Sequence, residues 1–144
     1  MARVKLTPLD TYPFSVRLIV RSTDLNRADH LSAYALVGML DAAYAQFIRE
    51  LDLGQPGLGA PNLSSINADL QVNYLGEGKL HDELVVEMAT LDLTEKSFRI
   101  HYRLTCDDRP IALAEIGVVC FDYGAKKPAP LPQVFVDAIA RLAV

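Results

Sequence analysis

The sequence predicts an α+β fold in which a curved antiparallel β-sheet wraps around one long central α-helix. One observation is a stretch without proline, residues 31–51, that carries apolar side chains at helical spacing. The other is that most remaining segments alternate between apolar and polar residues and are joined by tight turns, as the strands of hairpins are. One substantial helix inserted after the first strand of such a sheet favours an α+β arrangement over an alternating parallel one. At 144 residues, we expect one domain, 1–144, with its own core.

The first predicted strand is Phe14–Ser22, in which apolar residues at every second position alternate with serine and arginine. A short polar loop follows it. This loop contains four side chains that are suited to binding or catalysis, namely Asp24, Asn26, Asp29 and His30.

The predicted helix, Leu31–Leu51, is apolar on nearly every side. Its wide stripe consists of Leu36, Val37, Leu40, Ala43, Tyr44, Phe47, Ile48 and Leu51. The opposite face is small and apolar as well, and consists of Ala35, Gly38, Met39, Ala42 and Ala45. A helix of this kind is buried on more than one side. We therefore expect the sheet to wrap around it, and a second subunit is a candidate cover for the remaining face.

Four antiparallel strands are predicted after the helix. A loop rich in glycine, proline and serine, Gly54–Ser65, leads to the first of them, Ala68–Tyr74. A turn at residues 76–78 connects it to Glu83–Leu93, which is largely apolar on both faces. The clearest strand is Ser97–Cys106, because it alternates strictly between an apolar face and a basic face.

The last predicted strand, Pro110–Tyr123, is the partner of Ser97–Cys106. Proline fits its first position because proline cannot donate to the hydrogen-bond ladder. A proline-rich exit, Gly124–Pro132, then leads to Gln133–Leu142, which is either a short terminal helix or a frayed tail.

Composition argues against several classes of function. The net charge of -4 argues against a nucleic-acid partner, since a basic face is the expected electrostatic footprint of one. No apolar run approaches the roughly 18 residues of a membrane span, and the first residues lack the apolar segment of a signal peptide. Cys106 and Cys120 are expected to lie too far apart on neighbouring strands to form a disulfide. We therefore expect a cytoplasmic protein with reduced thiols.

Four short segments carry a family resemblance. They are Thr23-Asp24-Leu25-Asn26, Asp29-His30-Leu31, Leu40-Asp41-Ala42-Ala43, and the late strand ending in Cys120-Phe121-Asp122-Tyr123 with Lys127-Pro128 after it. Together with the order of the elements, they make the chain resemble the hotdog-fold acyl-CoA thioesterases of the 4-hydroxybenzoyl-CoA thioesterase-like superfamily. The resemblance runs from about Val16 to Pro132.

The resemblance implies a hotdog fold that dimerises through a continuous sheet, with a homotetramer as the next level of assembly. The substrate is then an acyl-CoA or acyl-carrier-protein thioester that water hydrolyses at the dimer interface. Coenzyme A is part of that substrate, so no further cofactor is expected. Amides at the start of the central helix hold the thioester carbonyl, since a helix N-terminus offers unsatisfied donors and a positive end.

The sequence departs from the family pattern at catalytic positions. Asn26 stands where the usual catalytic aspartate is found, and Asp29 replaces the glycine before the histidine. An amide cannot accept a proton at neutral pH. We therefore expect Asp41, on the helix, to be the general base, while Asn26 and His30 position water and the carbonyl. The alternatives are a solvated Asp41, and loop-fixing roles for Asn26 and His30.

Other candidates surround these three. Those expected to bind substrate near the helix start are Asp24, Asp29, Leu31, Ser32 and Tyr34; the two aspartates are equally suited to capping the helix. Candidates for the coenzyme A phosphates are Arg99, Arg103, Lys126 and Lys127, whose alternative is ordinary solvation. Glu115, an isolated charge on an apolar face, is either buried with a partner or marks an exposed part of that face. No histidines have ligand spacing, so no metal site is expected.

A rival class of function is a non-catalytic hotdog protein that binds acyl thioesters or serves as an assembly module. Asn26, in place of an aspartate, is the feature that keeps this alternative open. A dehydratase of the same fold is less favoured, because the loop does not resemble those of such enzymes.

Overall fold

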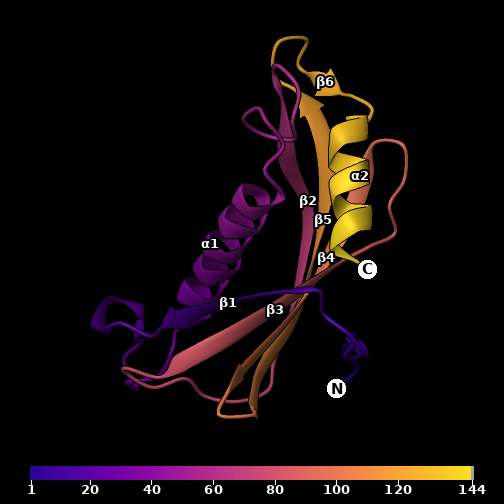
Figure 1. Cartoon of the computed structure of the whole chain (residues 1–144). Coiled ribbons are helices and arrows are strands. Elements are labelled where there is room, and N and C mark those ends of the chain that lie inside the picture. The colour runs from indigo at the N-terminus through magenta and orange to yellow at the C-terminus, as the bar shows by residue number, and fades with distance from the viewer. Residues whose placement is uncertain (144) are drawn as a thin grey trace.

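The computed structural model describes residues 1–143. The elements in chain order are β1 (Phe14–Ile19), a single 3-10 turn (Ser22–Asp24), α1 (Ala33–Leu51), β2 (Leu63–Tyr74), β3 (Glu83–Leu91), β4 (Ser97–Cys106), β5 (Arg109–Asp122), β6 (Lys127–Pro128) and α2 (Gln133–Leu142). Figure 1 shows α1 along one side of the strands and the short α2 at the end of the chain.

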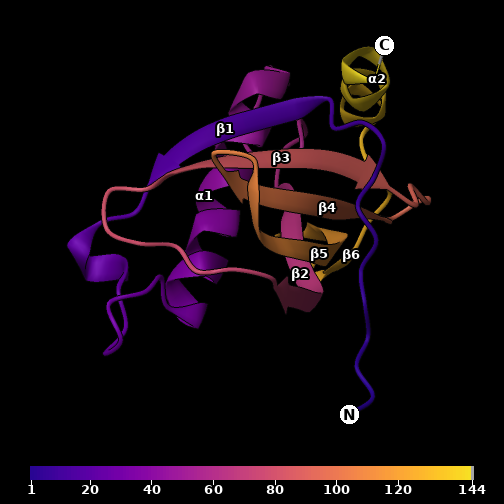
Figure 2. The same cartoon turned by 90° about the horizontal axis from the view of Figure 1, so that it is seen from below.

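The strands form one antiparallel sheet in the order β1-β3-β4-β5-β2, and the short β6 pairs with β5. Seen from below, β1, β3, β4 and β5 run side by side (Figure 2). β1 and β2 are therefore the edges. β2 is 12 residues long and pairs with β5 along one side only. The predicted architecture, a curved antiparallel sheet around one long helix, is confirmed.

α1 supplies one side of the core. Its buried residues are Ala35, Leu36, Met39, Leu40, Ala43, Phe47 and Leu51. They face alternate residues of the central strand β4, of which Phe98, Ile100, Tyr102 and Leu104 are almost fully buried. The helix starts at Ala33 because the Ser32 hydroxyl accepts the N–H of Ala35 at 3.2 Å. It stops where Asp52 turns into the left-handed conformation, at φ 48°.

The second helix completes the same core. Of the two predicted alternatives for Gln133–Leu142, the structure shows the helix. Its Phe135 is fully buried, and the Phe135 and Phe98 ring centres are 4.9 Å apart. This aromatic contact fixes α2 against β4.

Some predicted boundaries were wrong. β2 begins at Leu63, inside the predicted loop, because residues 63–67 pair with β5. A bulge between Asn67 and Asp69 shifts the register there, so the alternation is broken in the sequence. β1 ends at Ile19 because Ser22–Asp24 forms a turn, and β3 ends at Leu91.

One face of α1 is open in the single chain. Tyr34, Gly38, Asp41, Ala42 and Ala45 are exposed or half-buried there. The sheet therefore covers most of the wide stripe, while the opposite face is only partly covered: Ala35 and Met39 are buried, and Gly38, Ala42 and Ala45 are exposed. That a second subunit covers this face stays a prediction. Cys106 and Cys120 are both buried and free, as predicted.

Candidate functional site

The loop before α1 is organised by Asn26. The Asn26 Oδ1 accepts the N–H of Ala28 at 2.9 Å and the N–H of His30 at 3.2 Å. The Asn26 N–H in turn donates to the carbonyl oxygen of His30 at 2.8 Å. The side-chain oxygen is thus occupied by the loop, and the free polar atom of the Asn26 side chain is its amide Nδ2. That group can donate to a carbonyl or a water, but it cannot accept a proton.

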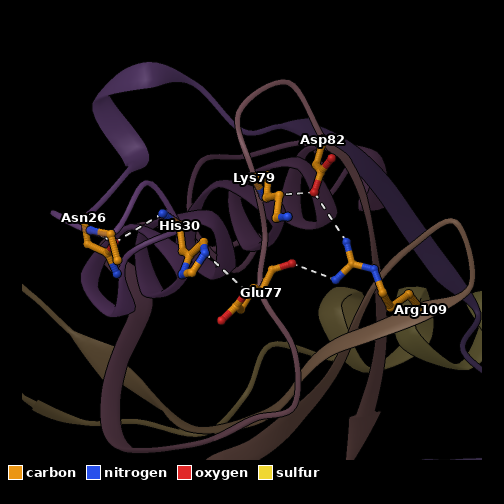
Figure 3. Close-up of polar contacts among 7 residues, drawn as sticks. Asn26, His30, Glu77, Lys79, Asp82 and Arg109 are labelled. Carbon is orange, nitrogen blue, oxygen red and sulfur yellow. Dashed lines mark hydrogen bonds and ion pairs between the residues drawn. The ribbon is translucent and has the colours of Figure 1, made fainter.

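His30 is tied to a segment far away in sequence. Its Nε2 lies 3.2 Å from Oε2 of Glu77, in the connection between β2 and β3 (Figure 3). The N–H of Leu31 donates to the carbonyl oxygen of Gly78 at 2.7 Å. Arg109 holds the same connection from its other side, since it donates to the carbonyl oxygen of Glu77 at 2.7 Å. The structure therefore adds Glu77 as an acidic partner of His30, which sequence reasoning missed.

Gly78 allows a close approach at this crossing. A Cβ atom there would lie 3.0 Å from the Cβ of Leu31, closer than side chains normally pack. The glycine lets the β2–β3 connection lie directly against the loop that carries His30.

Asp24 and Asp29 have structural places in the same loop. Asp24 is buried, its Oδ2 accepts the N–H of Arg21 at 2.8 Å, and its carbonyl oxygen accepts the N–H of Ser32 at 2.9 Å. Asp29 is exposed and adopts a left-handed conformation at φ 60°, where its backbone stands in for a glycine. Substrate contacts by these two residues stay predictions.

The start of α1 offers two open donors. Just before the helix, the N–H groups of His30, Leu31 and Ser32 already donate to Asn26, Gly78 and Asp24, as described above. Within residues 1–143, the N–H groups of Ala33 and Tyr34 have no acceptor. The Tyr34 side chain is 71% exposed, so this end of the helix is accessible. Two adjacent N–H groups at a helix N-terminus can stabilise a developing negative charge.

Asp41 lies in a different part of the structure. It follows Ala33 by eight residues, which is about 12 Å along the helix axis. It lines a cavity of about 290 Å³ between α1 and the edge strand β2. The structure therefore brings Asn26 and His30 together, but within one chain it does not bring Asp41 to them.

The Asp41 cavity has a polar rim and an apolar floor. Its lining runs from exposed residues, Asp41, Ile66 and Asn67, through the half-buried Tyr44 and Ser65 to the buried Tyr102, Ile116 and Val118. Burial raises the pKa of the Tyr44 hydroxyl to about 12, and the neighbouring Ser65 hydroxyl only partly offsets that rise. Burial, with smaller contributions from Tyr44 and Asp41, raises the pKa of Tyr102 as well. Both phenols therefore stay protonated at neutral pH.

The predicted phosphate contacts are not assembled into one patch. Arg99 is paired with Glu115 and with Asp69, whose Oδ1 lies 2.7 Å from Nη2 of Arg99. Arg103 is paired with Glu87 at 2.6 Å. Both arginines lie on the face of β4 opposite Tyr102, because side chains alternate along a strand. Lys126 and Lys127 are exposed at the β5–β6 turn. A phosphate role for these four residues stays a prediction, and the ion pairs count against it for the arginines.

The same contacts decide between the two predicted alternatives for Glu115. Of its two predicted alternatives, the structure shows a largely buried carboxylate with a partner, Arg99.

A second groove runs along the other flank of α1. Its volume is about 690 Å³, and its lining includes Arg17, Arg21, Tyr34, Gly38 and Ala42. Sequence reasoning did not single out Arg17 and Arg21, which lie on the strand and turn before the loop. Among residues 1–143, no three His, Cys, Asp or Glu side chains gather as a metal site requires. No helix in this part of the chain is long and apolar enough to cross a membrane.

Comparison with known proteins was made on sequence and on structure. The sequence model of a family described as the thioesterase-like superfamily matches residues 20–139. A comparison with curated proteins finds no match.

Solved structures share the fold over nearly the whole chain. A thioesterase from Thermus thermophilus, complexed with coenzyme A and Zn, is 26% identical; the alignment covers 93% of this chain and 96% of that chain, with a TM-score of 0.77. A 1,4-dihydroxy-2-naphthoyl-CoA thioesterase from Synechocystis is 19% identical, with 91% and 98% covered and a TM-score of 0.80. A protein from Staphylococcus aureus in complex with CoA is 16% identical, with 96% and 87% covered and a TM-score of 0.81.

Proposed function

Because the chain belongs to the thioesterase-like superfamily, we propose that it hydrolyses an acyl-CoA or acyl-carrier-protein thioester with water, in the cytoplasm. The observation that carries the proposal is the accessible start of α1. There, the open N–H groups of Ala33 and Tyr34 follow directly on the loop that presents Asn26 and His30. Donors held in place before the reaction stabilise the oxyanion that forms when a thioester carbonyl is attacked.

The general base in this proposal is Asp41, supplied by a second copy of the chain. Asp41 and the helix start are about 12 Å apart within one chain, too far to act on one carbonyl group. A carboxylate acting as base must come within hydrogen-bond reach of the attacking water. A dimer is one way to bring the two parts of the site together.

The free edge of β2 supports this dimer. Its 12 residues leave one side of the backbone unpaired, and Ile66, Leu70 and Tyr74 are 42%, 46% and 51% exposed. A long edge strand with exposed apolar residues is a template for pairing with another strand. Two copies of β2 can pair antiparallel and so form a continuous sheet across the dimer.

The same pairing would join the two halves of the site. The Tyr74 hydroxyl donates to the carbonyl oxygen of Ala33 at 3.5 Å, so this end of β2 lies beside the helix start. The other end, at Ile66, lines the Asp41 cavity. An antiparallel pair centred on Leu70 sets Ile66 opposite Tyr74 of the partner subunit. Each Asp41 would then face the helix start of the other chain.

A screen of the purified protein against acyl-CoAs, with a dye that detects the released thiol, tests the activity. We expect turnover of at least one thioester. We also expect Asp41→Asn to lower kcat by at least about 100-fold with little change in KM, since that is the usual effect of removing a general base. The matched control is Asp10→Asn, an exposed carboxylate in the N-terminal segment.

Two results would count against separate parts of the proposal. Absence of turnover by a folded oligomer on any thioester would remove the hydrolase assignment. Full activity of Asp41→Asn would keep the hydrolase and remove Asp41 as its base.

A second candidate function is thioester binding without hydrolysis. It is favoured by one observation: Asn26 stands where the usual catalytic aspartate is found, and its side-chain oxygen accepts two N–H groups of the loop and so serves the loop structure. Calorimetry with an acyl-CoA separates the two functions, because tight binding that leaves the ester intact would identify a binding protein.

A further inference from the structure

Glu77 lies between two side chains that come from distant parts of the chain (Figure 3). Its Oε2 lies 3.2 Å from Nε2 of His30, and its carbonyl oxygen accepts an N–H of Arg109 Nη1 at 2.7 Å. The Nη2 of Arg109 also lies 3.5 Å from Oδ2 of Asp82, which accepts the N–H of Lys79 at 2.9 Å. Arg109, at the start of β5, therefore ties the β2–β3 connection to the sheet.

The residues on either side of Glu77 are anchored as well. The N–H of Gly76 donates to the carbonyl oxygen of Ile111 in β5 at 3.1 Å, and the carbonyl oxygen of Gly78 accepts the N–H of Leu31 at 2.7 Å. A Cβ atom at Gly76 would collide with the backbone of β5, so this close approach depends on the glycine. The backbone therefore sets where the carboxylate stands relative to the histidine ring.

The contact between Glu77 and His30 has little to contribute to the stability of the fold. Their side chains are 62% and 32% exposed, in that order. Water solvates and salt screens an ion pair this accessible, so such pairs stabilise proteins only slightly. The effect of Glu77 on the proton of the His30 ring is more specific, because a neutral imidazole has one protonated nitrogen and one bare nitrogen.

An ionised carboxylate favours one of these two tautomers. Its oxygens only accept hydrogen bonds, so the nitrogen beside it, Nε2 of His30, is the one that keeps the proton. Nδ1 is then an acceptor, and it has no hydrogen-bond partner within the described residues, 1–143. The loop therefore offers a free acceptor, Nδ1 of His30, together with a free donor, Nδ2 of Asn26.

We propose that Glu77 is a positioning residue, which keeps the proton of the neutral His30 ring on Nε2 so that Nδ1 accepts a hydrogen bond from the attacking water. The inference rests on the proposed hydrolase function. One O–H group of the water donates to Nδ1, and the other gives its proton to Asp41 of the partner subunit. The water oxygen forms the new bond to the carbonyl carbon, from which the thiolate then departs. With the proton on Nδ1 instead, the ring would donate to the water and occupy the lone pair needed for attack.

The kinetics of Glu77→Gln test the proposal, because the substitution removes the charge and keeps the size of the side chain. We expect kcat to fall by about tenfold or more, as when a carboxylate that fixes a histidine tautomer becomes an amide, with KM within about threefold of wild type. The control is Glu50→Gln: the Glu50 side chain is 61% exposed and lies 4.0 Å from Arg49, and its loss should leave kcat unchanged. Both variants should keep Tm within about 4 °C of wild type, since exposed ion pairs contribute little to stability.

Nuclear magnetic resonance measures the tautomer itself. The chain has three histidines, so spectra of His81→Gln and His101→Gln, labelled with ¹⁵N-histidine, identify the His30 signals. At about pH 8.5, where an isolated imidazole is neutral, the ¹⁵N shifts distinguish the protonated from the bare ring nitrogen. We expect the wild-type His30 ring to carry its proton almost wholly on Nε2, and the ring in Glu77→Gln to show a mixture of tautomers.

The outcomes for the two proposals are distinct. A proton on Nδ1 in the wild-type protein, an unchanged tautomer in Glu77→Gln, or a kcat of that variant within about threefold of wild type would overturn the inference and leave the hydrolase function intact. A fall in kcat together with a large fall in Tm would show a structural role for Glu77 and would overturn the inference as well. A lack of hydrolysis of every thioester tested would remove the proposed function and, with it, the inference.

Discussion

Asp29 has a backbone conformation that few side chains tolerate. Its φ of 60° is left-handed, a region that glycine enters freely and that aspartate and asparagine enter at a modest cost. The residue is exposed, so its side chain does not pack against the loop. The loop geometry that presents Asn26 and His30 therefore depends on the backbone at position 29.

Substitutions at Asp29 should follow this backbone requirement. We expect Asp29→Gly and Asp29→Asn to leave the free energy of unfolding within about 0.5 kcal/mol of wild type, since both residues accept φ above zero. A β-branched residue does not, so Asp29→Val should lower it by about 1–2 kcal/mol. Urea denaturation measures all three, and equal stabilities of the valine and glycine variants would contradict the prediction.

At this scale the sequence could identify part of the site. Asn26 and His30 are four residues apart in one loop, so their proximity follows from the chain itself. Glu77 could not be found in this way, because 47 residues separate it from His30 and only the folded β2–β3 connection brings the two together. Tyr44 was counted in the apolar stripe, since helical spacing does not reveal that its hydroxyl lies in the Asp41 cavity beside Ser65.

Among the elements, β4 has one face in the core and the other face against the N-terminal segment. Tyr102 faces the core, while the next residue toward the N-terminus, His101, faces the N-terminal segment. The Tyr12 hydroxyl lies 3.3 Å from Nδ1 of His101. Burial lowers the pKa of His101; Glu115 and a hydrogen bond to the backbone of Thr7 oppose this effect, and Arg103 adds a smaller lowering effect.

This lowered pKa should make the fold sensitive to acid. The unfolded chain binds a proton near pH 6.5, whereas the folded protein resists protonation of His101, so stability falls as the pH drops through 6.5 toward the lower folded pKa. We expect the unfolding free energy of wild type to fall more steeply between pH 7.5 and pH 5 than that of His101→Gln. Urea titrations at both pH values measure the difference. The exposed His81 provides a control, because His81→Gln should keep the wild-type slope.

The elements were predictable wherever the alternation was unbroken. β4 was expected at Ser97–Cys106 and lies there, since its two faces differ at every position. β2 was expected to begin at Ala68 but begins at Leu63, because the bulge near Asn67 interrupts the two-residue period. Pairing with β5 decides where β2 starts. The start could not be predicted because the sequence of β2 alone does not indicate which of its residues pair with β5.

For the whole molecule, the proposed dimer depends on β2. In an antiparallel pair centred on Leu70, the two copies of residue 70 face each other directly. Like charges placed opposite one another destabilise a strand pair. We therefore expect Leu70→Lys to convert a dimer into a folded monomer in light scattering, and to lower kcat/KM by at least about tenfold because each site would lose half of its groups.

A second lysine variant controls for charge alone. Leu93→Lys places a lysine at another exposed leucine, 42% accessible and outside β2, and should remain dimeric and active. A Leu70→Lys protein that is still a dimer would show that the chains pair through another surface. A monomer with full activity would show that one chain contains the whole site.

The segment between β2 and β3 follows directly on the edge strand, and it also supplies the carboxylate beside His30 and the carbonyl that anchors Leu31. In the proposed dimer, the strand that pairs the two copies is therefore directly connected to the segment that positions His30. A small shift in the pairing of the two β2 strands would move Glu77 and Gly78, and would therefore move His30. Substitutions in the β2 contact of the proposed dimer could therefore change the position of His30 and the catalytic rate, without altering a residue that touches the substrate.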